Sequence, residues 1–271
     1  MSHKGFLIAG NWKMHPDTLG EAKAVFASIA RKAKSARKTV VVIAPPAPFI
    51  RDLGGKGGKA GKSGAKGNAN GGRPGIVRMA AQDVSEHHSG AFTGSVSARE
   101  LRSAGAEYAI IGHSERRAAG DTGEIVAKKA KQALEAGLRV ILCVGETERD
   151  GHARYLQTVR EQVHSVLSAI DKKLARWMTI AYEPVWAIGK SYDSAPKPQD
   201  IHEMSIYIRK TAAEVLGKKS GLDIPVLYGG SVDAENAKAI LKDASIDGLL
   251  VGRESLDPKS FGNIIEYADS I

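Results

Sequence analysis

Cysteine is almost absent from this sequence, since Cys143 is the only one in 271 residues. A lone cysteine cannot form an intramolecular disulfide, so nothing here indicates an oxidising compartment. Long apolar runs are also missing: no stretch reaches the roughly 18 residues that a transmembrane helix requires. The apolar run at residues 6–9 is too short for the core of a signal peptide. We therefore expect a cytoplasmic protein with no membrane partner.

Acidic residues are absent from one segment, residues 54–74, which contains nine glycines and five cations in 21 residues. These cations account for more than half of the formal net charge of +9. The segment has no large apolar side chain, so it cannot bury enough surface to offset its ordering entropy. We expect a disordered insertion within a single domain that spans residues 1–271. Loose contact of the insertion with nucleic acid or polyphosphate is the alternative to a solvated linker, but it has no aromatic residues to support such contact, so we expect no nucleic-acid partner.

Short apolar runs alternate with helical patterns along the rest of the chain. The expected strands are residues 5–10, 39–44, 76–81, 107–112, 138–144, 178–183, 224–228 and 247–251. The expected helices between and after them are residues 19–35, 124–136, 152–170, 199–217, 233–242 and 259–268. Continuously apolar strands are typical of parallel sheets that are covered on both faces. Eight strand–helix units predict an α/β fold, the (β/α)8 barrel. An open doubly wound sheet is the alternative, but it usually has a glycine-rich first turn.

Polar residues follow three of the expected strands, at the carboxyl ends where parallel barrels build their active sites. Asn11 and Lys13 follow the first strand, and their spacing would point both to the same side of an extended chain. His113 follows the fourth strand and Glu183 ends the sixth. We therefore expect an ammonium group, an imidazole and a carboxylate to meet at one mouth of the barrel.

Seven short strings resemble segments of the triosephosphate isomerase family and occur in the family's order. They are residues 9–14 (AGNWKM), 90–94 (GAFTG), 111–117 (IGHSERR), 142–147 (LCVGET), 181–189 (AYEPVWAIG), 228–232 (YGGSV) and 250–252 (LVG). The first and the last of them are far apart, so that together they span residues 9–252. A different barrel enzyme for sugar phosphates would not need all of them. A binding protein descended from an isomerase would be expected to have lost at least one of the four polar residues at the strand ends. All four are present in this chain: Asn11, Lys13, His113 and Glu183.

The resemblance implies an isomerase that interconverts glyceraldehyde 3-phosphate and dihydroxyacetone phosphate without a metal or organic cofactor. Glu183 would move a proton between the two substrate carbons and His113 would polarise the carbonyl oxygens. Lys13 and Asn11 would stabilise the enediolate. Such a reaction needs a base over a C–H bond and donors aimed at an oxyanion. A helix is expected to begin just after His113, and its positive end would disfavour the imidazolium form.

The resemblance also implies a phosphate site made by Gly189, Ser231, Gly252 and Arg253. Backbone N–H groups after the seventh and eighth strands, among them those of residues 229–231, would face the phosphate. The chain departs from the family at two places. Arg253 stands where a glycine is usual, and residues 190–197 differ from the usual sequence of the lid that covers the substrate.

Three further expectations concern the surroundings of the site. Residues 85–97 resemble the family's interface loop, which implies a homodimer. Glu115 and Glu146 are expected to support neighbouring groups rather than to touch the substrate. The run Glu86-His87-His88 is not expected to bind a metal, because adjacent histidines diverge and no third ligand has suitable spacing.

Replacing residues 54–74 with a short Gly/Ser turn should leave kcat and KM within about twofold. The segment connects an expected helix end near Leu53 to the strand that begins near Ile76, on the face opposite the active site. Its cations would lie well beyond the screening length of about 8 Å at physiological salt. The test is kcat/KM of the full and trimmed proteins at low and physiological ionic strength. A fall of more than about fivefold at physiological salt would show that the insertion is functional.

Overall fold

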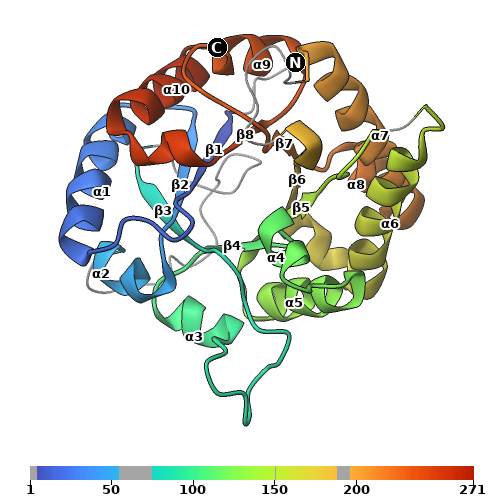
Figure 1. Ribbon diagram of the computed structural model, residues 1–271, viewed down its shortest axis with the longest axis horizontal. Coiled ribbons are helices and arrows are strands. Elements are labelled where there is room, and N and C mark those ends of the chain that lie inside the picture. Colours follow the sequence, from blue (N-terminus) through green and yellow to red (C-terminus); the bar gives the residue numbers. More distant parts are fainter. Residues whose placement is uncertain (1–4, 55–74, 150, 188–195) are drawn as a thin grey trace.

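Eight parallel strands close into a barrel in the order of the sequence, from β1 to β8. This computed structural model describes residues 5–54, 75–149, 151–187 and 196–271. The expected insertion, apart from Gly54, and Gly189 lie outside these residues. Because β1 pairs with both β2 and β8, the sheet has no open edge. The predicted (β/α)8 barrel is confirmed, and Figure 1 shows the helices as a ring around the strands.

Each expected strand is present, usually one or two residues shorter than predicted. The strands are β1 (Leu7–Asn11), β2 (Val40–Ala44), β3 (Val77–Ala81), β4 (Tyr108–Ile111), β5 (Arg139–Val144), β6 (Met178–Tyr182), β7 (Val226–Tyr228) and β8 (Gly248–Val251). Glu183 therefore follows β6 instead of ending it, and Asn11 ends β1 instead of following it. Nearly all strand residues are buried, which explains why the runs are apolar on both faces. Inward-facing residues such as Leu7, Val42 and Ile110 form one cluster inside the barrel, and the other faces pack against the helices.

The helices cover the outside of the barrel. They are α1 (Leu19–Ala33), α2 (Ile50–Leu53), α3 (Ala98–Ser103), α4 (Ser114–Ala118), α5 (Gly123–Glu135), α6 (Arg154–Ala169), α7 (Pro198–Leu216), α8 (Lys218–Leu222), α9 (Ala237–Asp243) and α10 (Pro258–Ser270). The six predicted ranges each overlap a helix, whereas α2, α3 and α8 lie outside those ranges. The helix expected from residue 233 begins at Ala237. Asp233 accepts the N–H groups of Glu235 and Asn236, so these residues form a turn ahead of the helix.

Capping residues explain where two of the helices begin. In α1, the Thr18 hydroxyl accepts the N–H of Glu21 while the Glu21 carboxylate accepts the N–H of Thr18. Ser97 and Glu100 make the same reciprocal pair at the start of α3. Each pair satisfies two N–H groups that the first turn of a helix leaves without an intrahelical partner.

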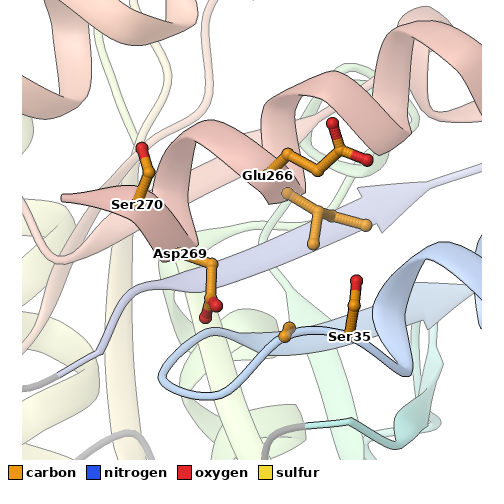
Figure 2. A pocket seen from close by; sticks show the side chains of 6 residues that line it. Ser35, Glu266, Asp269 and Ser270 are labelled. Atoms are coloured by element: carbon orange, nitrogen blue, oxygen red, sulfur yellow. The ribbon is translucent and has the colours of Figure 1, made fainter.

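The last helix is fastened to the segment that leads into β2. The Asp269 carboxylate near the end of α10 accepts the backbone N–H groups of Arg37, Lys38 and Thr39, with shortest distances of 2.9, 2.7 and 2.8 Å. A cavity of about 180 Å³ lies beside this carboxylate, and Figure 2 shows Ser35, Glu266, Asp269 and Ser270 along its walls. Both acids are already bonded, Glu266 to Lys32 and Asp269 to the backbone, so we assign the cavity no ligand.

Asp269→Asn should destabilise the fold by about 1 kcal/mol at pH 7, after allowance for solvent screening. Partial burial favours a higher pKa for Asp269, but the three backbone hydrogen bonds outweigh it and lower the pKa from its ordinary 3.8. The stabilisation is therefore complete above the unfolded pKa and is lost as the pH falls through the lower folded value. Thermal unfolding of both proteins at pH 7 and near pH 3 tests this. A difference in midpoint that does not shrink at low pH would contradict it.

Candidate active site

Glu183 and His113 face each other across the carboxyl ends of β4 and β6. The His113 Nε2 atom lies 3.3 Å from the Glu183 Oε1 atom. Both residues are buried, with 8% of His113 and 2% of Glu183 exposed. The predicted meeting of a carboxylate and an imidazole at one mouth is therefore present in the structure.

The orientation of His113 is set by the helix that begins beside it. Helix α4 starts at Ser114, as expected, and the backbone N–H of Glu115 donates to the His113 Nδ1 atom at 3.2 Å. Because Nδ1 accepts this bond, an imidazole with a single proton carries that proton on Nε2. The ring thus turns an N–H donor toward Glu183 and the mouth.

Gly112 gives His113 its place at the end of β4. It has a φ of +72°, a conformation that glycine adopts far more readily than other residues. A Cβ atom there would also lie 2.9 Å from both Arg117 Nη2 and Val126 Cγ1. Arg117 occupies this space because it donates to the carbonyl oxygens of Gly112 and Cys143, at 2.8 and 3.1 Å. The arginine thereby ties the turn before His113 to β5.

Glu183 fits between neighbouring strands because glycines stand on both sides. A Cβ atom at Gly145, after β5, would overlap the Glu183 carbonyl oxygen, and one at Gly229, after β7, would lie 3.0 Å from the Glu183 Cγ atom. The Glu183 Oε2 atom accepts the N–H of Ser114 at 3.1 Å. One carboxylate oxygen is therefore held by the start of α4, and the other faces the imidazole.

Lys13 and Asn11 lie at the same mouth, but the predicted reason for it is wrong. The chain is not extended at Lys13, which has a φ of +53°. The Asn11 Oδ1 atom instead accepts the Lys13 N–H at 3.0 Å and closes a tight turn. The Lys13 Nζ atom lies 2.6 Å from the Glu115 Oε1 atom. A Cβ atom at Gly252 would lie 3.9 Å from the Lys13 Cε atom, so the lysine stem passes beside the end of β8.

Glu146 anchors the chain on both sides of Glu183. Its Oε1 atom accepts bonds from the Tyr182 hydroxyl, the Trp186 Nε1–H and the Arg149 Nε–H, at 2.8, 2.8 and 3.1 Å. Burial, reinforced by the Glu146 charge, raises the pKa of the Tyr182 phenol, which therefore remains a donor. We expected Glu146 and Glu115 to support neighbouring groups, but their partners come from other strands and loops, which no local pattern indicates.

The structure places three of the residues predicted for the phosphate site near this mouth, and Gly189 lies outside the described residues. Gly252 follows β8, and Arg253 begins a 3-10 turn, Arg253–Leu256. The Ser231 hydroxyl donates to the Ala187 carbonyl at 3.2 Å, which links the segments after β7 and β6. One expectation is wrong: the Gly229 N–H donates to the Tyr182 carbonyl at 2.8 Å, so this N–H group is occupied within the sheet.

Cys143, on β5, is a further ionisable group beside Glu183. Burial, with the Glu183 charge adding to it, raises the pKa of the Cys143 thiol well above its ordinary value, so the thiol stays protonated. Within the described ranges, no cluster of three or more His, Cys, Asp or Glu side chains is placed to hold a metal ion. His87 stacks on Phe92, with ring centroids 3.5 Å apart. None of the helices described is long and apolar enough to cross a membrane.

Comparison with known proteins agrees with this geometry over nearly the full length of the chain. The family model for triosephosphate isomerase matches residues 6–268. The triosephosphate isomerase of Halorhodospira halophila is 40% identical over 97% of this chain and 97% of its own. The Thermus thermophilus enzyme is 38% identical over 97% of this chain and 98% of its own, and the Coprinopsis cinerea enzyme is 37% identical over 94% and 95%. With the barrel, the ordered motifs and these relatives in agreement, the chain belongs to the triosephosphate isomerase family.

Proposed function

We propose that this chain interconverts D-glyceraldehyde 3-phosphate and dihydroxyacetone phosphate, with Glu183 as the base and His113 as the electrophile. The observation that carries the proposal is the 3.3 Å separation of the His113 Nε2 and Glu183 Oε1 atoms at the mouth of the barrel. A carboxylate and an N–H donor this close can act on adjacent atoms of one small substrate. The curated relatives carry the name of this activity.

The reaction proceeds by two proton transfers on the carbon skeleton. Starting from the ketose, the Glu183 carboxylate takes a proton from C1, and the electron pair forms the C1–C2 double bond of an enediolate. His113 gives its Nε2 proton to the C2 oxygen and takes the proton of the C1 oxygen. Glu183 then returns a proton to C2, which leaves the C1 aldehyde. The base begins and ends as a carboxylate, so each turnover restores the site.

Lys13 supplies the positive charge of the site, and Asn11 supports the turn that carries it. The Lys13 ammonium group lies beside the ends of β1 and β8, where it can stabilise both the enediolate and the phosphate dianion. Its contact with Glu115, which is exposed to solvent, can be exchanged for an anionic substrate. Asn11, which is buried, keeps the turn around Lys13 closed through its side-chain oxygen.

The phosphate group would bind at the ends of β7 and β8, by Ser231, Gly252 and Arg253, together with Gly189. Gly252 lies next to the Lys13 stem, so a phosphate there would be close to the ammonium group. Arg253 in place of a glycine keeps the backbone N–H group, which is the feature needed to bind the anion. The Arg253 side chain itself is exposed to solvent.

A homodimer in the cytoplasm is the assembly that we propose for the active protein, acting as a single barrel domain. The segment between β3 and α3 projects from the ring of helices (teal, bottom of Figure 1). It carries Phe92 and Val96, which are 42% and 41% exposed, and Met14 near Lys13 is 86% exposed. Large apolar side chains on a projecting loop favour burial against a second copy.

Purified protein should isomerise glyceraldehyde 3-phosphate in an assay that couples dihydroxyacetone phosphate to NADH oxidation. Glu183→Asp should fold normally but lose at least about 100-fold in kcat, because the carboxylate retracts by roughly 1 Å. Glu161→Asp on the exposed face of α6 is the matched control and should keep full activity. Equal turnover in the Glu183→Asp and Glu161→Asp variants would remove Glu183 from the mechanism.

Light scattering should give twice the monomer mass of 28.8 kDa at concentrations where the protein is active. Phe92→Glu should shift the mass toward the monomer, because a charge at the centre of an apolar interface is costly to desolvate. A monomer mass at full activity would contradict the dimer without affecting the assignment of Glu183.

A further inference from the structure

Four charged side chains form an ion-pair cluster beside the active site. The Lys129 Nζ atom lies 2.7 Å from both Asp83 Oδ2 and Asp121 Oδ2. Arg116 Nε lies 3.0 Å from Asp83 Oδ2, and Arg116 Nη2 lies 3.6 Å from Asp121 Oδ1. The Lys129 side chain is only 4% exposed, so the centre of this cluster is shielded from water. We call these four residues the Asp83–Lys129 cluster.

The cluster joins three separate elements. Asp83 follows β3 by two residues, Lys129 is on α5, and Arg116 is on α4. Asp121 follows α4, and its N–H donates to the Arg116 carbonyl at 3.0 Å, so the end of this short helix is fixed as well. Helix α4 is too short to hold its place by its own hydrogen bonds. Its position therefore depends on side chains such as these.

Two residues that are adjacent in sequence to members of the cluster, Gln82 and Glu115, bind Lys13. Gln82, beside Asp83, donates from Nε2 to the carbonyl oxygens of Lys13 and Ala44, at 2.6 and 2.8 Å. Glu115, beside Arg116, pairs with the Lys13 ammonium group. The contacts thus close a ring that runs from the Lys13 backbone through Gln82 and Asp83 to α4, and back through Glu115 to the Lys13 side chain. The same helix begins at His113.

Burial makes the cluster sensitive to the loss of any member. It raises the pKa of Asp83 above its ordinary value even though Lys129 acts in the opposite direction. Without the Lys129 ammonium group, Asp83 and Asp121 would keep only Arg116, whose side chain is 46% exposed. Breaking one partner of a buried pair leaves charge uncompensated, and the segments that carry it move apart or take up water. Here those segments hold Lys13 and His113.

We propose that Lys129 and Asp83 are positioning residues, which set the place of the Lys13 turn relative to the helix that orients His113. This inference rests on the proposed isomerase function. Neither residue touches the substrate. Asp83 and Lys129 act through Gln82 and α4, which position the Lys13 and His113 side chains that bind and polarise the substrate.

Lys129→Met keeps the length of the side chain and removes the charge. It should lower kcat at least tenfold at a temperature where the protein is fully folded, with a smaller change in KM, because a small displacement of a reacting group has a large effect on rate. The matched control is Arg209→Met, which breaks the 2.7 Å pair with Asp247 at the opposite end of the barrel. The control should lose thermal stability but keep kcat within about twofold of the parent.

A second variant and a spectroscopic measurement cover the case in which Lys129→Met does not fold. Asp83→Asn is nearly isosteric and should give a smaller loss of kcat in the same direction. In ¹⁵N-labelled protein, the His113 ring nitrogens should show the Nε2–H tautomer in the parent and in Arg209→Met, and shifted signals in Asp83→Asn. Unchanged His113 signals together with a kcat within twofold of the parent would overturn the proposal. An inactive parent protein would instead refute the proposed function, because the His113 signals report on positioning without any turnover.

Discussion

The contact between His113 and Glu183 is the feature on which the rest of the site depends, because it brings a ring nitrogen and a carboxylate to one point of the mouth. The two residues come from strands that are far apart in sequence, and closure of the barrel brings their ends together. The proton on His113 Nε2 is fixed by the N–H of Glu115, and one oxygen of Glu183 is fixed by the N–H of Ser114. The first turn of α4 thus orients both the electrophile and the base.

Three buried or half-buried carboxylates of this barrel differ in the groups that balance their charge. Glu146 accepts three donors on one oxygen and serves as a fixed anchor. Glu183 has one backbone donor, an imidazole neighbour and the Cys143 thiol beside it, and none of these is a lysine or arginine. Asp83 is balanced by Lys129 and Arg116. Burying a charge is costly unless it is paired, and Glu183 is the one of these three carboxylates without a lysine or arginine partner among the described residues.

Much of the fold and part of the site could be predicted because they follow from local sequence. Apolar runs that are buried on both faces marked all eight strands, and the strand ends marked the residues at the mouth. The start of a helix after His113 was also predictable from the residues that follow it. Strand boundaries were less accurate, as at Glu183, because the end of a strand depends on its pairing with neighbours.

The features of the site that could not be predicted depend on contacts between segments that are far apart in sequence, and such contacts leave no local sequence pattern. The left-handed conformation of Lys13 is stabilised by Asn11 and Gln82, and the second of these comes from the end of β3. Gly229 resembled a phosphate-binding residue, but its N–H donates to the Tyr182 carbonyl of the neighbouring strand β6. The pairing of Glu115 with Lys13 could not be predicted either, because Lys13 follows the first strand and Glu115 follows the fourth.

The central claim is that one carboxylate carries a proton between adjacent carbons of the substrate. The most direct test is to convert glyceraldehyde 3-phosphate in D2O and to follow the product by proton NMR. While the proton is held by Glu183 it can exchange with solvent, so the account predicts dihydroxyacetone phosphate with deuterium at C1. In the Glu183→Asp variant this labelled product should form far more slowly. Product that forms at the normal rate without any deuterium at C1 would show that no exchangeable proton is held during turnover and would contradict the account.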